Sequence, residues 1–242
     1  RDEAKFVHLR DFGDALPRLR AVVAEDLGRT GLPPRKVTAL VVALLDRTLI
    51  RVGNDEYRRT NGTFGLTTLR SDQVDVDGAG IEFCFLGKGG QEHQVTLHDR
   101  RLARAVRACH ELGGRELFTY RGVDGAPVRV DSADCNEYLA DVAGPATTVK
   151  YFRTWGATVA VLEELAARDA PLAPADVVAA VDVAAGRLGN TRAVCRRSSV
   201  HPLLTDDLDE DRGREAGSSS RTSATMTRAE RATLRLLDGH DA

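Results

Sequence analysis

Apolar residues recur at every third or fourth position along most of the chain, which is the spacing of one face of a helix. In the first such segment Leu19, Val23 and Leu27 share a face, and Pro17 stands in the first turn, where a proline is tolerated. The helices that this spacing predicts cover residues 16–27, 36–51, 100–112, 132–139, 150–168, 174–188 and 227–237.

Between residues 66 and 97 the pattern changes to the alternation of apolar and polar residues that half-buried strands show. We expect Gly87-Lys88-Gly89-Gly90 to form the turn of a hairpin. The short strands predicted are 66–69, 74–76, 81–86 and 93–97. The predicted fold class is therefore mostly α with a small inserted antiparallel β-sheet, an α+β arrangement.

The composition agrees with a largely helical core. Hydrophobic residues make up 42% of the chain but aromatic residues only 5%, so Leu, Val and Ala must fill the interior. The net charge of −2 neither requires nor excludes a nucleic-acid partner, because local clusters of charge decide such binding. Most basic residues are arginines, whose guanidinium suits phosphate, although a compositional bias of the source genome accounts for many of them.

The cysteines Cys84, Cys109, Cys135 and Cys195 form no C-x-x-C pair. We expect buried thiols of a reducing compartment and neither a disulfide framework nor a metal site. No apolar run is long enough to span a membrane, and no signal peptide opens the chain, so a cytoplasmic location is expected. The first residue is Arg1 and not Met, which is consistent with an N-terminal piece having been removed.

The composition also predicts three parts along the chain. Residues 1–204 are expected to form one domain, with the β insertion at about 62–98. Residues 205–226 are expected to form a linker, because they are first acidic and then rich in Ser and Thr. Residues 227–242 are expected to contribute a C-terminal helix.

Several short blocks stand out along the chain. They are R-V-G-N-D-E-Y at 51–57 with F-G-L-T-T-L at 64–69, F-L-G-K at 85–88, S-A-D-C-N-E-Y-L at 132–139, K-Y-F-R-T-W at 150–155, and L-G-N-T at 188–191 with R-R-S-S-V-H-P at 196–202. They resemble blocks of type IB DNA topoisomerases of the bacterial and poxvirus kind, and they occur in the family's order. Each block alone is weak, but their shared order identifies the chain as similar to the catalytic domain of this family.

The resemblance implies a fold and a reaction. The fold is the DNA breaking-rejoining catalytic fold that the family shares with tyrosine recombinases. The reaction relaxes supercoiled double-stranded DNA: a tyrosine cuts one strand through a 3′-phosphotyrosyl link, and the strand is then religated without metal, ATP or another cofactor. A monomer associated with the bacterial nucleoid is implied, and the family's small N-terminal clamp domain is missing from this sequence.

The resemblance also assigns roles to residues. Arg51 and Arg153 would stabilise charge on the phosphoryl oxygens, because a guanidinium stays protonated and matches their geometry. Lys88, at the hairpin tip, would protonate the leaving 5′-oxygen as a general acid. Asn190 would donate a hydrogen bond to a non-bridging oxygen.

Further positions are expected to contact the DNA backbone. Lys150 lies three residues before Arg153, on the same helix face. The weaker candidates come from the blocks around them. The full set of expected backbone contacts is Tyr57, Lys150, Thr67, Thr68, Arg196 and Arg197.

The sequence departs from the family where the nucleophilic tyrosine is expected, because Ser199 occupies that position. A serine hydroxyl lies several ångströms closer to the backbone and is far less acidic than a phenol, so it needs a base. Tyr151 stands where the family usually has Asp, but positions 151 and 153 of a helix point to different faces, which argues against Tyr151 as the attacking group.

Three alternatives to an active topoisomerase stay open at this point. The chain is a DNA-binding homologue without catalysis, a tyrosine recombinase, or a helical protein unrelated to nucleic acid. Recombinases usually carry H-x-x-R at the second arginine, whereas this sequence has Lys150-x-x-Arg153. Whether Ser199 is natural or engineered is also open.

Overall fold

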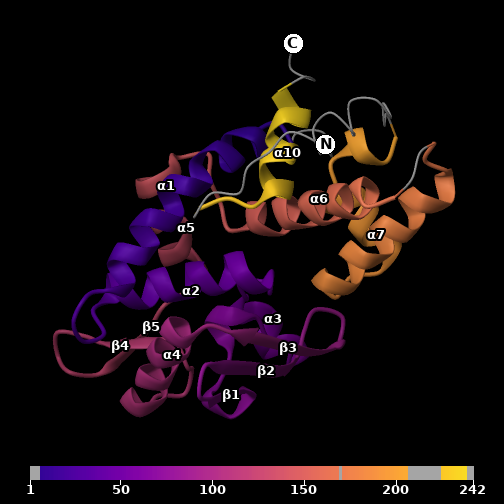
Figure 1. Cartoon of the computed structure of the whole chain (residues 1–242). Helices are drawn as coiled ribbons and strands as arrows, with labels where there is room; N and C mark the ends of the chain where they lie inside the picture. Colours follow the sequence, from indigo (N-terminus) through magenta and orange to yellow (C-terminus); the bar gives the residue numbers. More distant parts are fainter. Residues whose placement is uncertain (1–5, 169–170, 207–224, 239–242) are drawn as a thin grey trace. The chain divides into compact units, whose positions relative to one another are not determined.

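The computed structural model describes residues 6–168, 171–206 and 225–238 (Figure 1). The chain divides into two compact units. Unit 1 comprises Arg1–Arg18 and Lys150–Ala242, and unit 2 comprises Leu19–Val149. The predicted fold class is confirmed, because helices dominate and the main sheet is a small antiparallel one.

Unit 2 is built around the apolar helix α2, Pro34–Thr48. It packs against α4, Arg100–Leu112, and α5, Ser132–Ala143. Most of α2 is buried, which explains why its sequence is apolar on more than one face. The helix ends earlier than predicted, because Leu49 adopts a left-handed conformation with φ of 55°.

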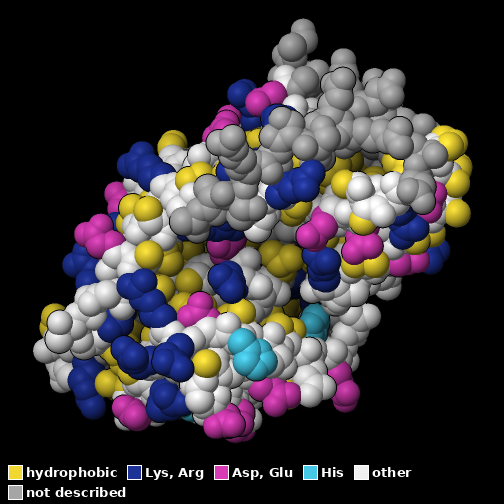
Figure 2. All heavy atoms as spheres, viewed as in Figure 1, with side chains coloured by type: hydrophobic (Ala, Val, Ile, Leu, Met, Phe, Trp, Pro, Cys, Tyr) yellow, Lys and Arg dark blue, Asp and Glu magenta, His cyan; other side chains and the backbone are white. Residues whose placement is uncertain are grey.

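Helix α4 separates its residue types by face. Leu102, Val106 and Cys109 are buried, whereas the arginines of the helix lie on the exposed side. In Figure 2, Lys and Arg side chains gather over the region where Figure 1 places α4. The exposed arginines of α4 are Arg100, Arg101, Arg104 and Arg107.

The main sheet of unit 2 has the order β1-β2-β3 and is antiparallel throughout. Its strands are β1, Val74–Asp77, β2, Gly80–Leu86, and β3, Glu92–His98. Phe83 and Phe85 of β2 are buried, and Cys84 between them points to the exposed face. The expectation of a buried thiol is therefore wrong for Cys84, because strand alternation overrides the apolar run, and it is confirmed for the other three cysteines.

The predicted strand at 66–69 is instead a 3₁₀ turn, η2, Leu66–Thr68. Leu66 N and Thr67 N donate to Arg51 O and Val52 O, at 2.8 and 2.7 Å. All three residues of the turn are buried, so the apolar and polar alternation does not reflect two faces. The turn η3, Ser71–Gln73, then leads into β1.

A short helix and a small hairpin of unit 2 carry no strong periodic signal and are not predicted by the sequence. Helix α3, Asp55–Asn61, is a short polar helix whose residues are all at least partly exposed. Strands β4, Thr119–Arg121, and β5, Pro127–Arg129, form a small hairpin of their own. Both are too short for a hydrophobic period to reveal.

Unit 1 is organised around α6, Lys150–Ala166, which packs against α7, Pro174–Leu188, and α10, Arg228–Asp238. Helix α8, Arg192–Ser198, and the turn η4, Pro202–Leu204, also belong to the described part of the unit. Helix α1, Leu9–Leu27, starts in unit 1 and is longer than predicted, with Pro17 inside it.

Aromatic rings fill the core of unit 1. Phe12 meets Phe152 and Trp155 edge to face, with centroids 5.1 and 6.4 Å apart. The indole N–H of Trp155 donates to the buried carboxylate of Glu230 at 3.4 Å. Glu230 in turn forms a capping box with Thr227, which fixes the start of α10.

The helix predicted at 227–237 is therefore present as α10. Most of the predicted linker at 205–226 lies outside the described residues, since residues 207–224 are not described. The domain boundaries expected at 204 and 227 stay predictions. Over the described ranges, no helix is both long and apolar enough to cross a membrane.

A buried carboxylate links three segments of unit 2. Asp26, whose side chain is 2% exposed, accepts hydrogen bonds from Arg29, Arg35 and the Tyr138 hydroxyl at 2.6, 2.9 and 2.8 Å. Arg35 also lies over the Tyr138 ring, 5.0 Å from its centroid. Burial opposes ionisation of Asp26, but the hydrogen bonds outweigh it and lower the pKa of this carboxyl.

We predict that Asp26→Asn lowers the free energy of unfolding by about 1–3 kcal/mol at neutral pH. A depressed carboxyl pKa stabilises the fold above the unfolded value of about 4, so the difference between parent and variant should shrink as the pH falls below that value. Urea denaturation followed by circular dichroism across pH checks this. Asp72→Asn, at the exposed Arg70–Asp72 pair, is the matched control and should leave stability unchanged.

Two helical glycines of unit 1 should respond to alanine with opposite signs. A Cβ at Gly13 would lie 2.5 Å from the ring of buried Trp155, whereas a Cβ at Gly186 would meet nothing within 4 Å. Gly13→Ala should therefore destabilise by about 1–3 kcal/mol, and Gly186→Ala should stabilise by about 0.5–1 kcal/mol. Urea titrations read by Trp155 fluorescence test both, and equal effects at the two positions would contradict the packing described.

Candidate active site

In unit 2, contacts of the neighbouring backbone fix the position of Arg51. The chain leaves α2 through the left-handed turn at Leu49, and Ile50 is buried directly before Arg51. The carbonyl of Arg51 then accepts from Leu66 N of η2. The guanidinium is partly buried, and this burial lowers the pKa of Arg51 from its ordinary value. Its backbone position is thus set by two neighbouring elements.

Two glycines allow the Arg51 segment to approach η2. A Cβ at Gly65 would lie 2.5 Å from Gly53 N and 2.6 Å from Arg51 O, which no side chain can tolerate. Gly53 itself has a φ of +107°, a conformation that favours glycine. Steric limits therefore explain why the R-V-G-N and F-G-L-T-T-L blocks carry glycine at positions 53 and 65.

The threonines of η2 are placed beside Arg51 but are turned inward. Thr67 and Thr68 are both buried. The Thr67 hydroxyl donates to Val52 O at 2.9 Å, and the Thr68 hydroxyl bonds the backbone of Gly65 at 3.0 Å. Their described bonds hold the loop together, and their expected contact with DNA phosphate stays a prediction.

Helix α3 starts directly after this segment and carries Tyr57. The side chain of Asn54 caps the helix by accepting from Glu56 N and Tyr57 N, at 2.8 and 3.2 Å. The Tyr57 side chain is 49% exposed. The structure thus places this expected DNA-contacting residue on a short, capped helix at the surface.

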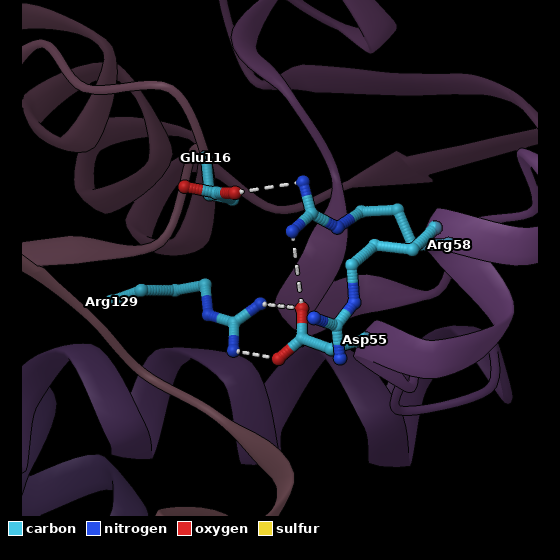
Figure 3. A pocket seen from close by; sticks show the side chains of 5 residues that line it. Asp55, Arg58, Glu116 and Arg129 are labelled. Carbon is cyan, nitrogen blue, oxygen red and sulfur yellow. Dashed lines mark hydrogen bonds and ion pairs between the residues drawn. The ribbon is translucent and has the colours of Figure 1, made fainter.

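A network of ion pairs anchors α3 to the rest of unit 2 (Figure 3). Asp55 accepts from both terminal nitrogens of Arg129, on β5, and Arg58 bridges Asp55 and Glu116. The Arg129 guanidinium lowers the pKa of the Asp55 carboxyl. Together with Arg59 these side chains line a pocket of about 260 Å³.

Sequence reasoning missed this network. Asp55 and Arg129 are 74 residues apart in the chain, and neither belongs to a recognisable spacing pattern. The acidic residue at the first position of a capped helix was the only available local signal.

Lys88 lies on the hairpin between β2 and β3, as predicted, and its side chain is exposed. Its ammonium nitrogen stands 5.8 Å from the centroid of the Tyr57 ring. This distance is within the range of a cation–π contact. The structure therefore brings together two of the predicted site residues of unit 2.

In unit 1, the second arginine and the asparagine meet. Arg153, on α6, donates to Leu188 O at 2.9 Å and to the side-chain oxygen of Asn190 at 3.3 Å. Gly189 ends α7 in a left-handed conformation, which turns the chain so that Asn190 follows the helix end. Lys150, exposed, is the first residue of α6, one turn before Arg153.

Ser199 ends helix α8, and only 6% of the residue is exposed. Its backbone N–H donates to Cys195 O at 2.9 Å. The Thr158 hydroxyl, on α6, lies 3.5 Å from Ser199 O and accepts from His201 N at 3.1 Å. Thr158 thus fixes the backbone on both sides of Val200, a role that sequence reasoning missed.

The two arginines before Ser199 point outward on α8. Arg196 donates to Thr205 O and to Asp206, at 3.0 and 2.9 Å. Arg197 is exposed. Both lie on the helix that ends at the position where the sequence predicts the nucleophile, and their contact with DNA stays a prediction.

Tyr151 is a packing residue of α6. Its ring stacks on Phe12 of α1, with centroids 5.6 Å apart. Burial and the nearby Asp11 raise the pKa of its phenol, which opposes its use as a nucleophile. Tyr151 and Arg153 therefore have different partners, as helix geometry predicts.

Comparisons with known proteins agree with this description. The family model described as eukaryotic DNA topoisomerase I, catalytic core, matches residues 1–216. The chain is 27% identical over 210 residues to DNA topoisomerase 1B of Acanthamoeba polyphaga mimivirus. The matched region covers 82% of this chain and 62% of the viral protein.

Two plant proteins are also similar. DNA topoisomerase 1 alpha of Arabidopsis thaliana is 24% identical over 68% of this chain, and DNA topoisomerase 1 of Daucus carota is 26% identical over 66%. The chain spans 17% and 19% of the length of these plant relatives. Because the family model covers most of the chain, this protein belongs to the type IB DNA topoisomerase family and carries its catalytic core.

Proposed function

We propose that this chain binds duplex DNA with a site built for metal-free phosphoryl transfer, and that it cleaves the DNA poorly or not at all because Ser199 stands at the nucleophile position. The observation that carries the proposal is the combination of a paired Arg153 and Asn190 with a buried serine at the end of α8. The groups that would hold a phosphate are present, whereas the group that would attack it is not.

The Arg153–Asn190 contact suits the binding of a phosphoryl group. The asparagine oxygen accepts from the guanidinium, and this bond orients the amide nitrogen of Asn190 as a donor. Arg51, whose backbone is fixed in unit 2, would supply the second guanidinium. Such preorganised donors stabilise the charge that develops on phosphoryl oxygens.

Lys88 would act on the leaving group. In cleavage by the family's reaction, the tyrosine oxygen bonds to phosphorus, the bond from phosphorus to the 5′-oxygen breaks, and the leaving oxygen takes a proton. An ammonium on an exposed hairpin tip can reach a DNA strand and provide that proton. The same lysine would accept the proton back during religation.

Ser199 does not replace the tyrosine by simple substitution. Its hydroxyl would have to reach the phosphate from several ångströms further back, and misplacement by even about one ångström costs about a hundredfold in rate. An aliphatic hydroxyl also needs a base to become a nucleophile. The burial of Ser199 adds a further barrier.

The proposal extends to the setting in which the chain works. From the resemblance to bacterial members of the family, we infer a monomer that binds the DNA of a bacterial nucleoid. With a tyrosine at position 199, the same core would relax supercoiled DNA without ATP or a metal ion.

We predict that Ser199→Tyr gains strand cleavage that the parent chain lacks. The variant should form a covalent adduct with a nicked duplex on a denaturing gel, and it should relax supercoiled plasmid without ATP or magnesium. Ser199→Ala is the control and should match the parent chain in both assays. An adduct formed by the parent chain would overturn the assignment of Ser199, and a variant that binds DNA without cleaving it would show that the phosphate-binding groups are not competent.

A second prediction concerns the salt dependence of binding. Arg153→Ala should weaken binding to duplexes of any sequence and reduce the slope of log affinity against log salt by about one. Arg187→Ala, which removes an arginine paired with Glu163 and Glu164, is the matched control within unit 1. Fluorescence anisotropy with a labelled duplex at several salt concentrations measures both slopes, and identical slopes would argue against a phosphate contact by Arg153.

A further inference from the structure

We propose that Tyr57 is a positioning residue for Lys88, whose ammonium it holds against the face of its aromatic ring. The inference rests on the proposed function, in which Lys88 protonates the leaving 5′-oxygen. It goes beyond the expected contact of Tyr57 with the DNA backbone, because it assigns a task to the ring as well as to the hydroxyl.

The hairpin that carries Lys88 is fixed at its base. Leu86 O accepts from Phe64 N, and Gly87 N donates to Gln91 O, both at 2.7 Å. The rings of Phe85 and His93 stack across the two strands, with centroids 5.1 Å apart. These contacts set where the hairpin leaves the sheet.

The tip of the hairpin is a glycine-rich turn. Gly89 and Gly90 follow Lys88, and both have positive φ values, of 81° and 72°. Gly90 N donates to Gly87 O at 3.0 Å and closes the backbone of this turn, but none of these backbone contacts directs the side chain of Lys88. A long, flexible side chain at such a place needs a lateral contact to be directed, and the Tyr57 ring at 5.8 Å provides one.

The ring itself stands on a well-anchored helix. Asn54 caps α3, and the ion pairs of Asp55 with Arg129 and of Arg58 with Glu116 hold it to unit 2 (Figure 3). Tyr57 is therefore a fixed support for the Lys88 ammonium. Because Tyr57 is half exposed, its hydroxyl can face a DNA strand while the ring face contacts Lys88.

The contact can be tested without any DNA chemistry. The chain contains only four lysines, Lys5, Lys36, Lys88 and Lys150, so reductive ¹³C-methylation, which keeps the positive charge, gives a simple NMR spectrum. A lysine above a ring is shielded, and the Lys88 methyl signal, assigned with Lys88→Arg, should lie upfield of the other lysine signals. Tyr57→Phe should keep this shift and Tyr57→Leu should abolish it. An unshifted Lys88 signal in the parent chain would refute the contact.

The chemical consequence is tested in the Ser199→Tyr background with two leaving groups. A 5′-bridging sulfur leaves without a general acid, whereas the natural oxygen needs one. Tyr57→Leu should slow cleavage of the oxygen substrate by about tenfold. A general acid contributes about 10²–10⁴-fold to the rate, and a poorly directed Lys88 ammonium would lose part of that enhancement. The sulfur substrate should be slowed by Tyr57→Leu no more than by Tyr57→Phe, because both variants lack the hydroxyl and this substrate needs no general acid.

The controls separate the possible failures. Tyr57→Phe should affect both substrates equally, because it removes only the hydroxyl, and Tyr120→Leu, on β4, should affect neither. Equal slowing of both substrates by Tyr57→Leu would overturn the positioning role. If the Ser199→Tyr background cleaves neither substrate, the proposed function fails, and the NMR shift alone decides whether Tyr57 holds Lys88.

Discussion

The close approach of two backbone segments at Gly53 and Gly65 is the constraint on which the arrangement of unit 2 depends. The absence of both Cβ atoms lets the segment after α2 bond directly to η2. That bonding fixes Arg51, starts α3 in the right place and leads the chain into the sheet whose hairpin carries Lys88. Long cationic side chains lose much entropy when they are ordered, so an arginine site benefits from a backbone that is already held.

In unit 1, side-chain hydrogen bonds fix the second arginine, Arg153. The Arg153 side chain extends from α6 to the end of α7, where Leu188 O and the side-chain oxygen of Asn190 accept its hydrogen bonds. Thr158, one turn further along α6, holds the chain around Ser199 and His201. Helix α6 therefore orients both Arg153, which we propose to bind phosphate, and the segment that carries Ser199. The side of α6 that bears Phe152 and Trp155 packs against α1 and α10.

In the proposed function, DNA binding and attack on the phosphate are separable because different elements would provide them. The arginines, the lysine and the asparagine would act by charge and hydrogen bonding, which do not depend on the residue at position 199. Attack requires a reactive oxygen at one defined place, and on our proposal a serine held at the end of α8 would not supply it. Such a core would retain affinity for DNA while it loses the covalent step.

The sequence by itself determined the longer helices, the three strands between residues 74 and 98 and the family, because hydrophobic period, turn residues and short blocks in order are all local signals. It also named Arg51, Lys88, Arg153 and Asn190 and exposed the substitution at Ser199. The tertiary structure alone decided which groups meet: Asp55 with Arg129, Tyr57 with Lys88, Thr158 with Ser199. It also turned residues 66–68 into a buried 3₁₀ turn. These features follow from the packing of segments that lie far apart in the chain, which no local pattern encodes.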